Sequence, residues 1–145
     1  MQRTVIAIAL AVATSLGHAA VFPPTDANAS SSLQYAQALR AEAEPLSGPG
    51  AQPADVQRAV ALYQQALDYL ATPAAREQAF GDKSLIAEQV NLEYSQALAH
   101  VKLGNKQAAL AALERLANLA WKPSIERALA HEGLAALRDE PRFRA

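Results

Sequence analysis

Residues suited to acid–base or metal chemistry are few in this chain, and none of them stands at the spacing that such chemistry needs. His131 and Glu132 begin the His-Glu-x-x-His pattern of zinc-binding helices, but position 135 is Ala, so the second imidazole one helical turn later is missing. No cysteine or suitably placed serine accompanies His100, and we interpret it as a partly buried packing residue. The histidines therefore predict neither a metal site nor a catalytic base.

Other common catalytic patterns are also missing from the sequence. The absence of cysteine excludes disulfides, thiolate metal ligands and a cysteine nucleophile. The Gly-Pro-Gly sequence at positions 48–50 is not followed by the Gly-Lys-Ser or Gly-Lys-Thr of a phosphate-binding loop. Asp139 and Glu140 are adjacent, unlike two carboxylates that face each other across a cleft. We expect a non-catalytic protein without cofactor or metal; a small helical enzyme built on His100 or His131 is a competing hypothesis.

Composition and charge restrict the class of protein further. Of 145 residues, 51% are apolar, and the formal net charge is −1. A chain of this length and composition fits one small domain with a helical core. Nucleic acids and anionic membranes attract clustered Lys and Arg, and the sequence has no such cluster. We therefore expect no nucleic-acid partner.

The N-terminus has the features of a secretory signal. Arg3 supplies a positive charge and residues 5–16 form a mostly apolar run that small residues follow. This pattern predicts a signal peptide over residues 1–19, cleaved after about Ala19, with an uncleaved anchor as the alternative. No later segment is uniformly apolar, so we expect no stable membrane insertion after cleavage and a periplasmic or secreted bacterial protein. Residues 20–32 have no apolar period and are predicted to be a disordered linker.

The centre of the chain predicts two antiparallel helices. Apolar residues recur at helical spacing over Leu85–Leu103 and over Lys106–Ala120. Gly104 stands between them, where a glycine with positive φ ends a helix, and so short a connection makes the second helix fold back on the first. We predict that the first helix buries Ile86, Val90, Tyr94, Ala97, Leu98 and Val101, and that the second buries Ala109, Leu110, Leu113, Leu116, Ala117 and Ala120.

Further helices are predicted on both sides of this hairpin. They span about Leu33–Glu44, Ala54–Leu70, Pro73–Phe80 and Ile125–Glu132, as the positions of Pro, Gly and capping residues indicate. The second has an apolar stripe formed by Val56, Ala59, Val60, Tyr63, Ala66, Leu67 and Leu70. Together with the central hairpin, these helices form one all-α domain over residues 33–145.

Two of these helical segments resemble the tetratricopeptide repeat. The residues that match are Ala109 and Leu113 after Gly104, Ala97 in the preceding helix, and Ala59, Tyr63 and Ala66 in the earlier one. Ala59 and Ala109 are 50 residues apart, more than the family's period, which makes Pro73–Phe80 an insertion. The resemblance implies antiparallel hairpins stacked as a short right-handed superhelix. A plain helical bundle is the alternative fold.

In that family the first helix of each repeat lines a concave surface that holds an extended peptide or a helix. The resemblance therefore implies a non-catalytic scaffold that binds a protein or peptide partner through Asn91, Tyr94, Leu98, Val101 and Lys102. Core packing of the apolar members of this set is the alternative. The ending Leu137–Phe143 resembles sequences that follow such repeats in bacterial proteins, some of which continue into an enzymatic domain. An accessory module of a larger exported hydrolase or peptidase is thus the second functional hypothesis.

Overall fold

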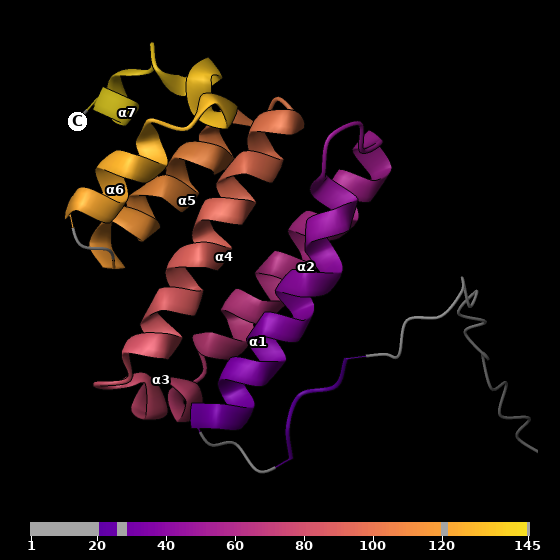
Figure 1. The fold of residues 1–145 in the computed structure, drawn as a ribbon, viewed down its shortest axis with the longest axis vertical. Helices are drawn as coiled ribbons and strands as arrows, with labels where there is room; N and C mark the ends of the chain where they lie inside the picture. Colours follow the sequence, from indigo (N-terminus) through magenta and orange to yellow (C-terminus); the bar gives the residue numbers. More distant parts are fainter. Residues whose placement is uncertain (1–20, 26–28, 120–121, 145) are drawn as a thin grey trace, which may run out of the picture.

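The computed structural model describes residues 21–25, 29–119 and 122–144, and within these ranges it contains helices and no strand. The all-α prediction is confirmed for this part of the chain (Figure 1). In chain order the elements are α1 (Ala29–Ala43), the 3-10 helix η1 (Glu44–Ser47), α2 (Pro53–Leu70), α3 (Pro73–Ala79), α4 (Lys83–Lys102), α5 (Lys106–Leu119), α6 (Lys122–Leu129), the 3-10 helix η2 (Glu132–Leu137) and α7 (Pro141–Arg144).

The first hairpin consists of α1 and α2, which pack along each other. The apolar stripe predicted for α2 is buried as expected, except that Val60 is only half-buried. Small residues let the two backbones approach, since Ala36 and Ala59 are both fully buried. The rings of Tyr35 and Tyr69 meet edge to face at a centroid distance of 4.7 Å, which is a favoured aromatic geometry. The two helices of the first hairpin are therefore closely packed against each other.

The second hairpin consists of α4 and α5 and forms the most extensive helix pair of the described chain. Gly104 ends α4 with φ +72°. Its N–H donates to the carbonyl of Val101, and the N–H of Asn105 donates to the carbonyl of His100, both at 2.9 Å, the bonding pattern of a Schellman motif. Ala97 and Ala109 lie in one buried cluster with no exposed surface, so the predicted hairpin is confirmed. The prediction that Ala117 is buried is wrong, because Ala117 lies on the exposed side of α5.

Helix α4 connects the two halves of the fold. It packs against α1 and α2 on one side and against α5 and η2 on another. Two clusters of buried residues meet along it. One contains Leu85, Leu92 and Ala99 together with the first hairpin, and the other contains Ala97 together with α5, η2 and the half-buried Phe143.

The predicted buried stripe of α4 is confirmed only in part. Ala97 is fully buried, and Tyr94, Leu98 and Val101 are partly buried and pack against the same cluster. The prediction is wrong for Ile86, which is exposed, and Val90 is only half-buried. The buried residues of α4 are instead Leu85, Glu88, Leu92, Glu93, Gln96, Ala97 and Ala99. Polar side chains occupy this face because each has a hydrogen-bonding partner on a neighbouring helix, and a satisfied polar group can be buried at little cost. The hydrophobic pattern alone therefore did not identify the most deeply buried side of the helix.

Several boundaries also differ from the predictions. Helix α1 begins at Ala29, inside the predicted linker 20–32, because Ser32 is fully buried and donates a 2.9 Å hydrogen bond to Gln78. Helix α6 covers Lys122–Leu129 and so begins and ends earlier than predicted. The predicted signal peptide and Ala120 lie outside the described residues.

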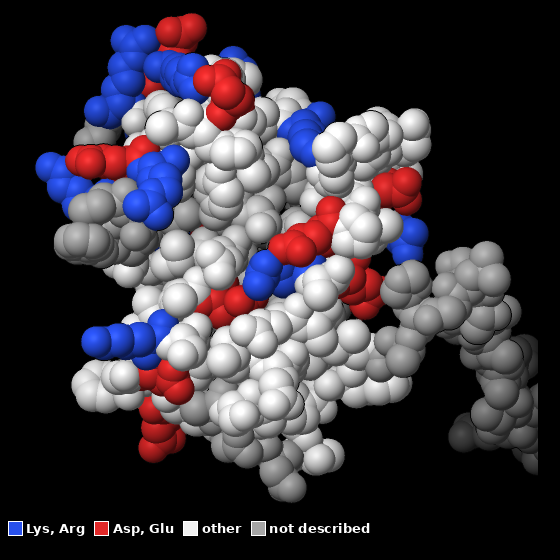
Figure 2. Space-filling model, in the orientation of Figure 1, with Lys and Arg blue, Asp and Glu red and all other residues white. Residues whose placement is uncertain are grey.

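No helix of the described ranges combines the length and apolar character that crossing a bilayer requires. On the face shown in Figure 2, basic and acidic side chains lie close together in mixed clusters, with broad uncharged areas between them.

Candidate partner-binding groove

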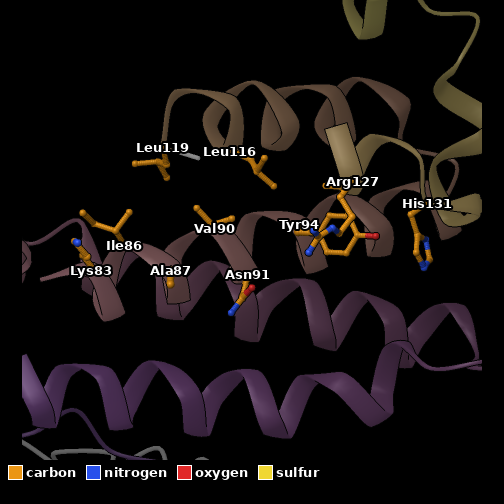
Figure 3. A pocket seen from close by; sticks show the side chains of 11 residues that line it. Lys83, Ile86, Ala87, Val90, Asn91, Tyr94, Leu116, Leu119, Arg127 and His131 are labelled. Carbon is orange, nitrogen blue, oxygen red and sulfur yellow. The ribbon is translucent and has the colours of Figure 1, made fainter. Parts of the chain in front are cut away.

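A groove of about 580 Å³ runs along the exposed side of α4. Its described lining comes from α4, from the last turns of α5, from α6 and from His131, which lies just before η2 (Figure 3). The residues are Lys83, Ile86, Ala87, Val90, Asn91, Tyr94, Leu116, Leu119, Arg127, Ala128 and His131. We refer to this surface as the α4–α6 groove. Its volume falls in the range of ordinary ligand sites.

The middle of the α4–α6 groove is apolar. In Figure 3, Ile86 and Val90 of α4 face Leu116 and Leu119 of α5 across it. Ile86 keeps 36% of its surface exposed, and it is one of three large apolar side chains exposed in the described chain. An exposed apolar surface in a concave setting is typical of an interaction site.

The polar groups of the α4–α6 groove are cations and neutral donors. Lys83 lies at one end of the groove, and Arg127 and His131 lie toward the other (Figure 3). No Asp or Glu is among the described lining residues, and within the described chain neither Lys83 nor Arg127 has an ion-pair partner. The groove therefore carries positive charge that the described part of the protein does not neutralise.

Tyr94 and His131 form the polar end of the groove. Their rings meet perpendicularly with centroids 5.9 Å apart, and the Tyr94 hydroxyl points toward His131 in Figure 3. The backbone N–H of Gly133 donates to Nδ1 of His131 at 3.0 Å, which leaves the proton of a neutral imidazole on Nε2. Burial raises the pKa of the Tyr94 hydroxyl, so at neutral pH it keeps its proton. Both side chains can thus donate hydrogen bonds to a bound molecule.

The five residues predicted from the sequence to bind a partner do not all lie together. Asn91 and Tyr94 line the α4–α6 groove. Leu98 and Lys102 line a second, smaller cavity of about 300 Å³ at the other end of α4, and Val101 packs against the α4–α5 core. Nζ of Lys102 donates to the carbonyl of Ser47 and, at 3.0 Å, to that of Gly48, so this ammonium group is already engaged with the turn after η1.

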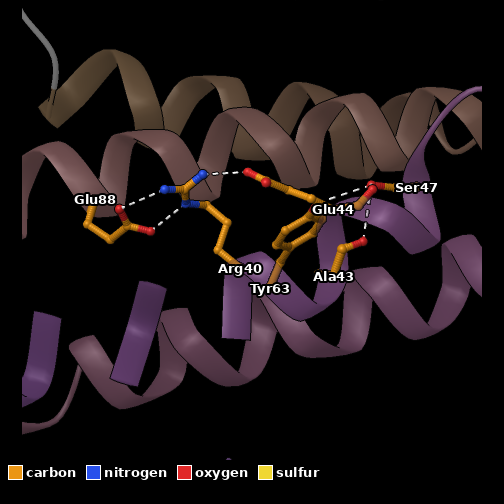
Figure 4. A network of polar contacts seen from close by, with 6 residues as sticks. All are labelled: Arg40, Ala43, Glu44, Ser47, Tyr63 and Glu88. Atoms are coloured by element: carbon orange, nitrogen blue, oxygen red, sulfur yellow. Dashed lines mark hydrogen bonds and ion pairs between the residues drawn. The ribbon is translucent and has the colours of Figure 1, made fainter. Parts of the chain in front are cut away.

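A network of polar contacts joins α4 to the first hairpin (Figure 4). Nε of Arg40 donates to one carboxylate oxygen of Glu88 at 2.6 Å, and Nη2 of Arg40 donates to the other at 3.3 Å. Nη1 of Arg40 donates to the carboxylate of Glu44. The hydroxyl of Tyr63 lies 3.1 Å from that of Ser47. The Glu88 hydrogen bond and charges raise the pKa of Arg40, and burial raises the pKa of Tyr63. Within the described chain these groups are therefore paired with one another across the helices.

A further set of polar side chains lies between α2, α4 and α5. Arg115 donates to Glu93 at 2.8 Å and to Gln96 at 3.2 Å. Burial raises the pKa of Glu93, and burial together with the charge of Arg115 lowers the pKa of His100. One carboxylate oxygen of Glu93 and Nδ1 of His100 are buried without a hydrogen-bonding partner in the described chain. Within the described residues, no three His, Asp or Glu side chains gather as metal ligands would.

Of the described lining residues of the groove, only Asn91 and Tyr94 were predicted from the sequence to bind a partner. Lys83 and Arg127 were not predicted as site residues, and Ile86 and Val90 were assigned to the core. One signal for them does exist in the sequence. The α4 segment carries two apolar stripes, one through Leu85, Leu92 and Ala99 and another through Ile86, Val90 and Tyr94. The neighbouring helices of α4 do not bury both stripes completely.

Comparison with known proteins gives no relative for this chain. No protein family, no curated protein and no solved structure matches it.

Proposed function

We propose that this chain is a non-catalytic binding module of an exported protein, and that it holds a peptide or a helix of a partner protein in the α4–α6 groove. The observation that carries the proposal is the apolar surface of the exposed Ile86 and the half-buried Val90 and Leu119, which the described residues leave accessible between the cationic ends of the groove. Grooves of this kind bind by burying apolar side chains of a partner, while polar groups at the ends fix its orientation.

The arrangement of the helices supports a tetratricopeptide-like stack as the scaffold of this module. Two antiparallel hairpins follow each other, and the first helix of the second hairpin, α4, packs against both helices of the first. The small residues Ala59, Ala97 and Ala109, which carry the resemblance, are all fully buried at helix contacts. In such a stack, α4 and α6 would be successive first helices, and the groove between them would be part of the concave surface.

A matched pair of variants tests the binding function. Ala87 lines the α4–α6 groove and Ala61 lies on α2; both are exposed. We expect peptides selected from a displayed random library on the wild-type chain to lose binding to Ala87→Glu and to keep binding to Ala61→Glu. The reason is that only the first substitution places a bulky charge in the groove. Titration by fluorescence anisotropy measures both.

The same experiment decides against the proposal under a defined result. If selected peptides bind Ala87→Glu and Ala61→Glu equally well, the groove is not their site. If no peptide is enriched over a selection on an unrelated protein, the chain is not a peptide-binding module.

A further inference from the structure

We propose that the partner segment in the α4–α6 groove is an amphipathic α-helix that carries acidic residues at two positions about three turns apart. This inference rests on the proposed binding function and specifies the partner. Its basis is the charge of the groove, the length between its charged ends and the fact that Asn91 is the only described residue along its middle with a hydrogen-bonding side chain.

The charged ends of the groove set the spacing of the acidic residues. Lys83 stands at the first turn of α4, and Arg127 and His131 lie near Tyr94, eleven residues further along the same helix (Figure 3). At 1.5 Å per residue, this separation is about 16 Å. A carboxylate opposite each end neutralises a cation that has no partner within the described chain, and the two carboxylates of a helical partner are then about 11 residues apart.

The lining of the groove favours a helix over an extended peptide. Between the charged ends the described lining is aliphatic, apart from Asn91, whose amide is the only group there that can bond a main chain. An extended segment would press its N–H and C=O groups against this aliphatic surface without partners, and burying such groups unpaired is costly. A helix bonds its own backbone internally and presents apolar side chains at i, i+3, i+4 and i+7.

The end of the groove near α6 has the donors that a carboxylate requires. Arg127 supplies a guanidinium, the Tyr94 hydroxyl has no hydrogen-bonding partner in the described chain, and Nε2 of His131 carries a proton because Nδ1 accepts from Gly133. Charge-assisted hydrogen bonds of this kind are the strongest that side chains make. No acidic side chain of the described lining competes for them.

Charge reversal with synthetic peptides tests the inference. The probes are two amphipathic peptides of about 18 residues with identical apolar faces; one has Glu at two positions three turns apart, and the other has Lys there. We expect the wild-type chain to bind the Glu peptide about tenfold more tightly than the Lys peptide, because two partly exposed ion pairs each contribute a fewfold effect. The double variant Lys83→Glu/Arg127→Glu is expected to reverse this preference.

A second double variant controls for net charge. Arg58→Glu/Arg76→Glu changes the charge by the same amount at exposed positions that do not line the groove, and it should keep the wild-type preference for the Glu peptide. Circular dichroism should show the Glu peptide gaining helix on binding. A proline at the centre of the peptide should abolish binding, because it removes a helical hydrogen bond and clashes with the preceding turn.

The possible results separate the inference from the proposed function. Equal binding of both peptides, lost in Ala87→Glu, leaves the groove as a binding site and overturns the acidic partner. Undiminished binding of the proline-containing peptide overturns the helical partner. The proposed function itself is overturned if neither peptide shows binding that Ala87→Glu abolishes and the library selection also fails.

Discussion

The two sides of α4 differ in the kind of residue that they bury. The side that faces α1 and α2 is closed, and it buries Glu88 and Gln96 next to Leu92. The side that faces α6 is open, and it leaves Ile86 exposed and Val90 half-buried. Polar residues are therefore covered on the closed side, whereas apolar residues are left accessible on the open side.

The cations on the two sides differ in the same way. On the closed side, Arg40 forms ion pairs with Glu88 and Glu44. On the open side, Lys83 and Arg127 have no anionic partner within the described chain. An ion pair that is already made contributes to the fold, whereas an unpaired cation beside an apolar groove is available to a ligand. Stability and binding should therefore respond to substitutions on different sides of one helix.

The largest difference is expected for apolar truncations. Leu92 has no exposed surface, so Leu92→Ala should lower the free energy of unfolding by about 3 kcal/mol through lost burial and a residual cavity. Ile86→Ala removes a side chain that is already 36% exposed and should cost less than about 1 kcal/mol. Urea unfolding followed by circular dichroism measures both. Equal losses would mean that the groove side is part of the core.

Removal of one cation from each side should have a smaller effect. Arg40→Met leaves the carboxylate of Glu88, which is only 3% exposed, without its ion-pair partner, and should cost about 2 kcal/mol because a buried charge then stands alone. Arg127→Met should change stability by less than about 0.5 kcal/mol, because it breaks no ion pair of the described chain. Thermal unfolding of the two variants under identical conditions distinguishes them, and a comparable loss in Arg127→Met would contradict the assignment of Arg127 to a free groove.

Much of the helical framework could be predicted from the sequence because local signals determine it. Thr72 accepts a hydrogen bond from the N–H of Ala75, and Asp82 accepts from the N–H groups of Ser84 and Leu85. Thr before Pro73 and Asp before a helix are residue types that favour such caps. Gly104 likewise has the positive φ that its place between two apolar segments required. These features depend on residues within a few positions of each other, so one sequence is enough to find them.

The orientation of α4 could not be predicted in this way. Which of its stripes is buried depends on partners far along the chain, since Arg40 pairs with Glu88 and Gln64 accepts a hydrogen bond from Gln96. Without these contacts, Glu88 and Gln96 read as solvent-facing residues, and the apolar stripe of Ile86, Val90 and Tyr94 reads as core. The groove was missed for the same reason, because it forms where α6 approaches a stripe that was assigned to the interior.

The smallest expected effect concerns the pH dependence of stability, which should arise from Glu93 and His100 of α4, near Arg115 of α5. Burial and Arg115 lower the pKa of His100 below its ordinary 6.5, so the stability that its neutral form provides is complete above pH 6.5 and is lost as the pH falls through the lowered pKa. Burial raises the pKa of Glu93 above 4.5, so its contribution is complete below pH 4.5 and is lost as the pH rises through the raised pKa.

Two conservative variants separate these opposite contributions. Relative to wild type, His100→Gln should become more stable as the pH is lowered from about 7 to about 5, whereas Glu93→Gln should become more stable as the pH is raised from about 4. Glutamine at position 93 can still accept the hydrogen bond of Arg115, so the second comparison isolates the charge. Urea unfolding across this pH range measures both differences. Curves parallel to wild type for both variants would show that neither buried group titrates differently on folding, and the pH response of the fold would then have to come from other groups than Glu93 and His100.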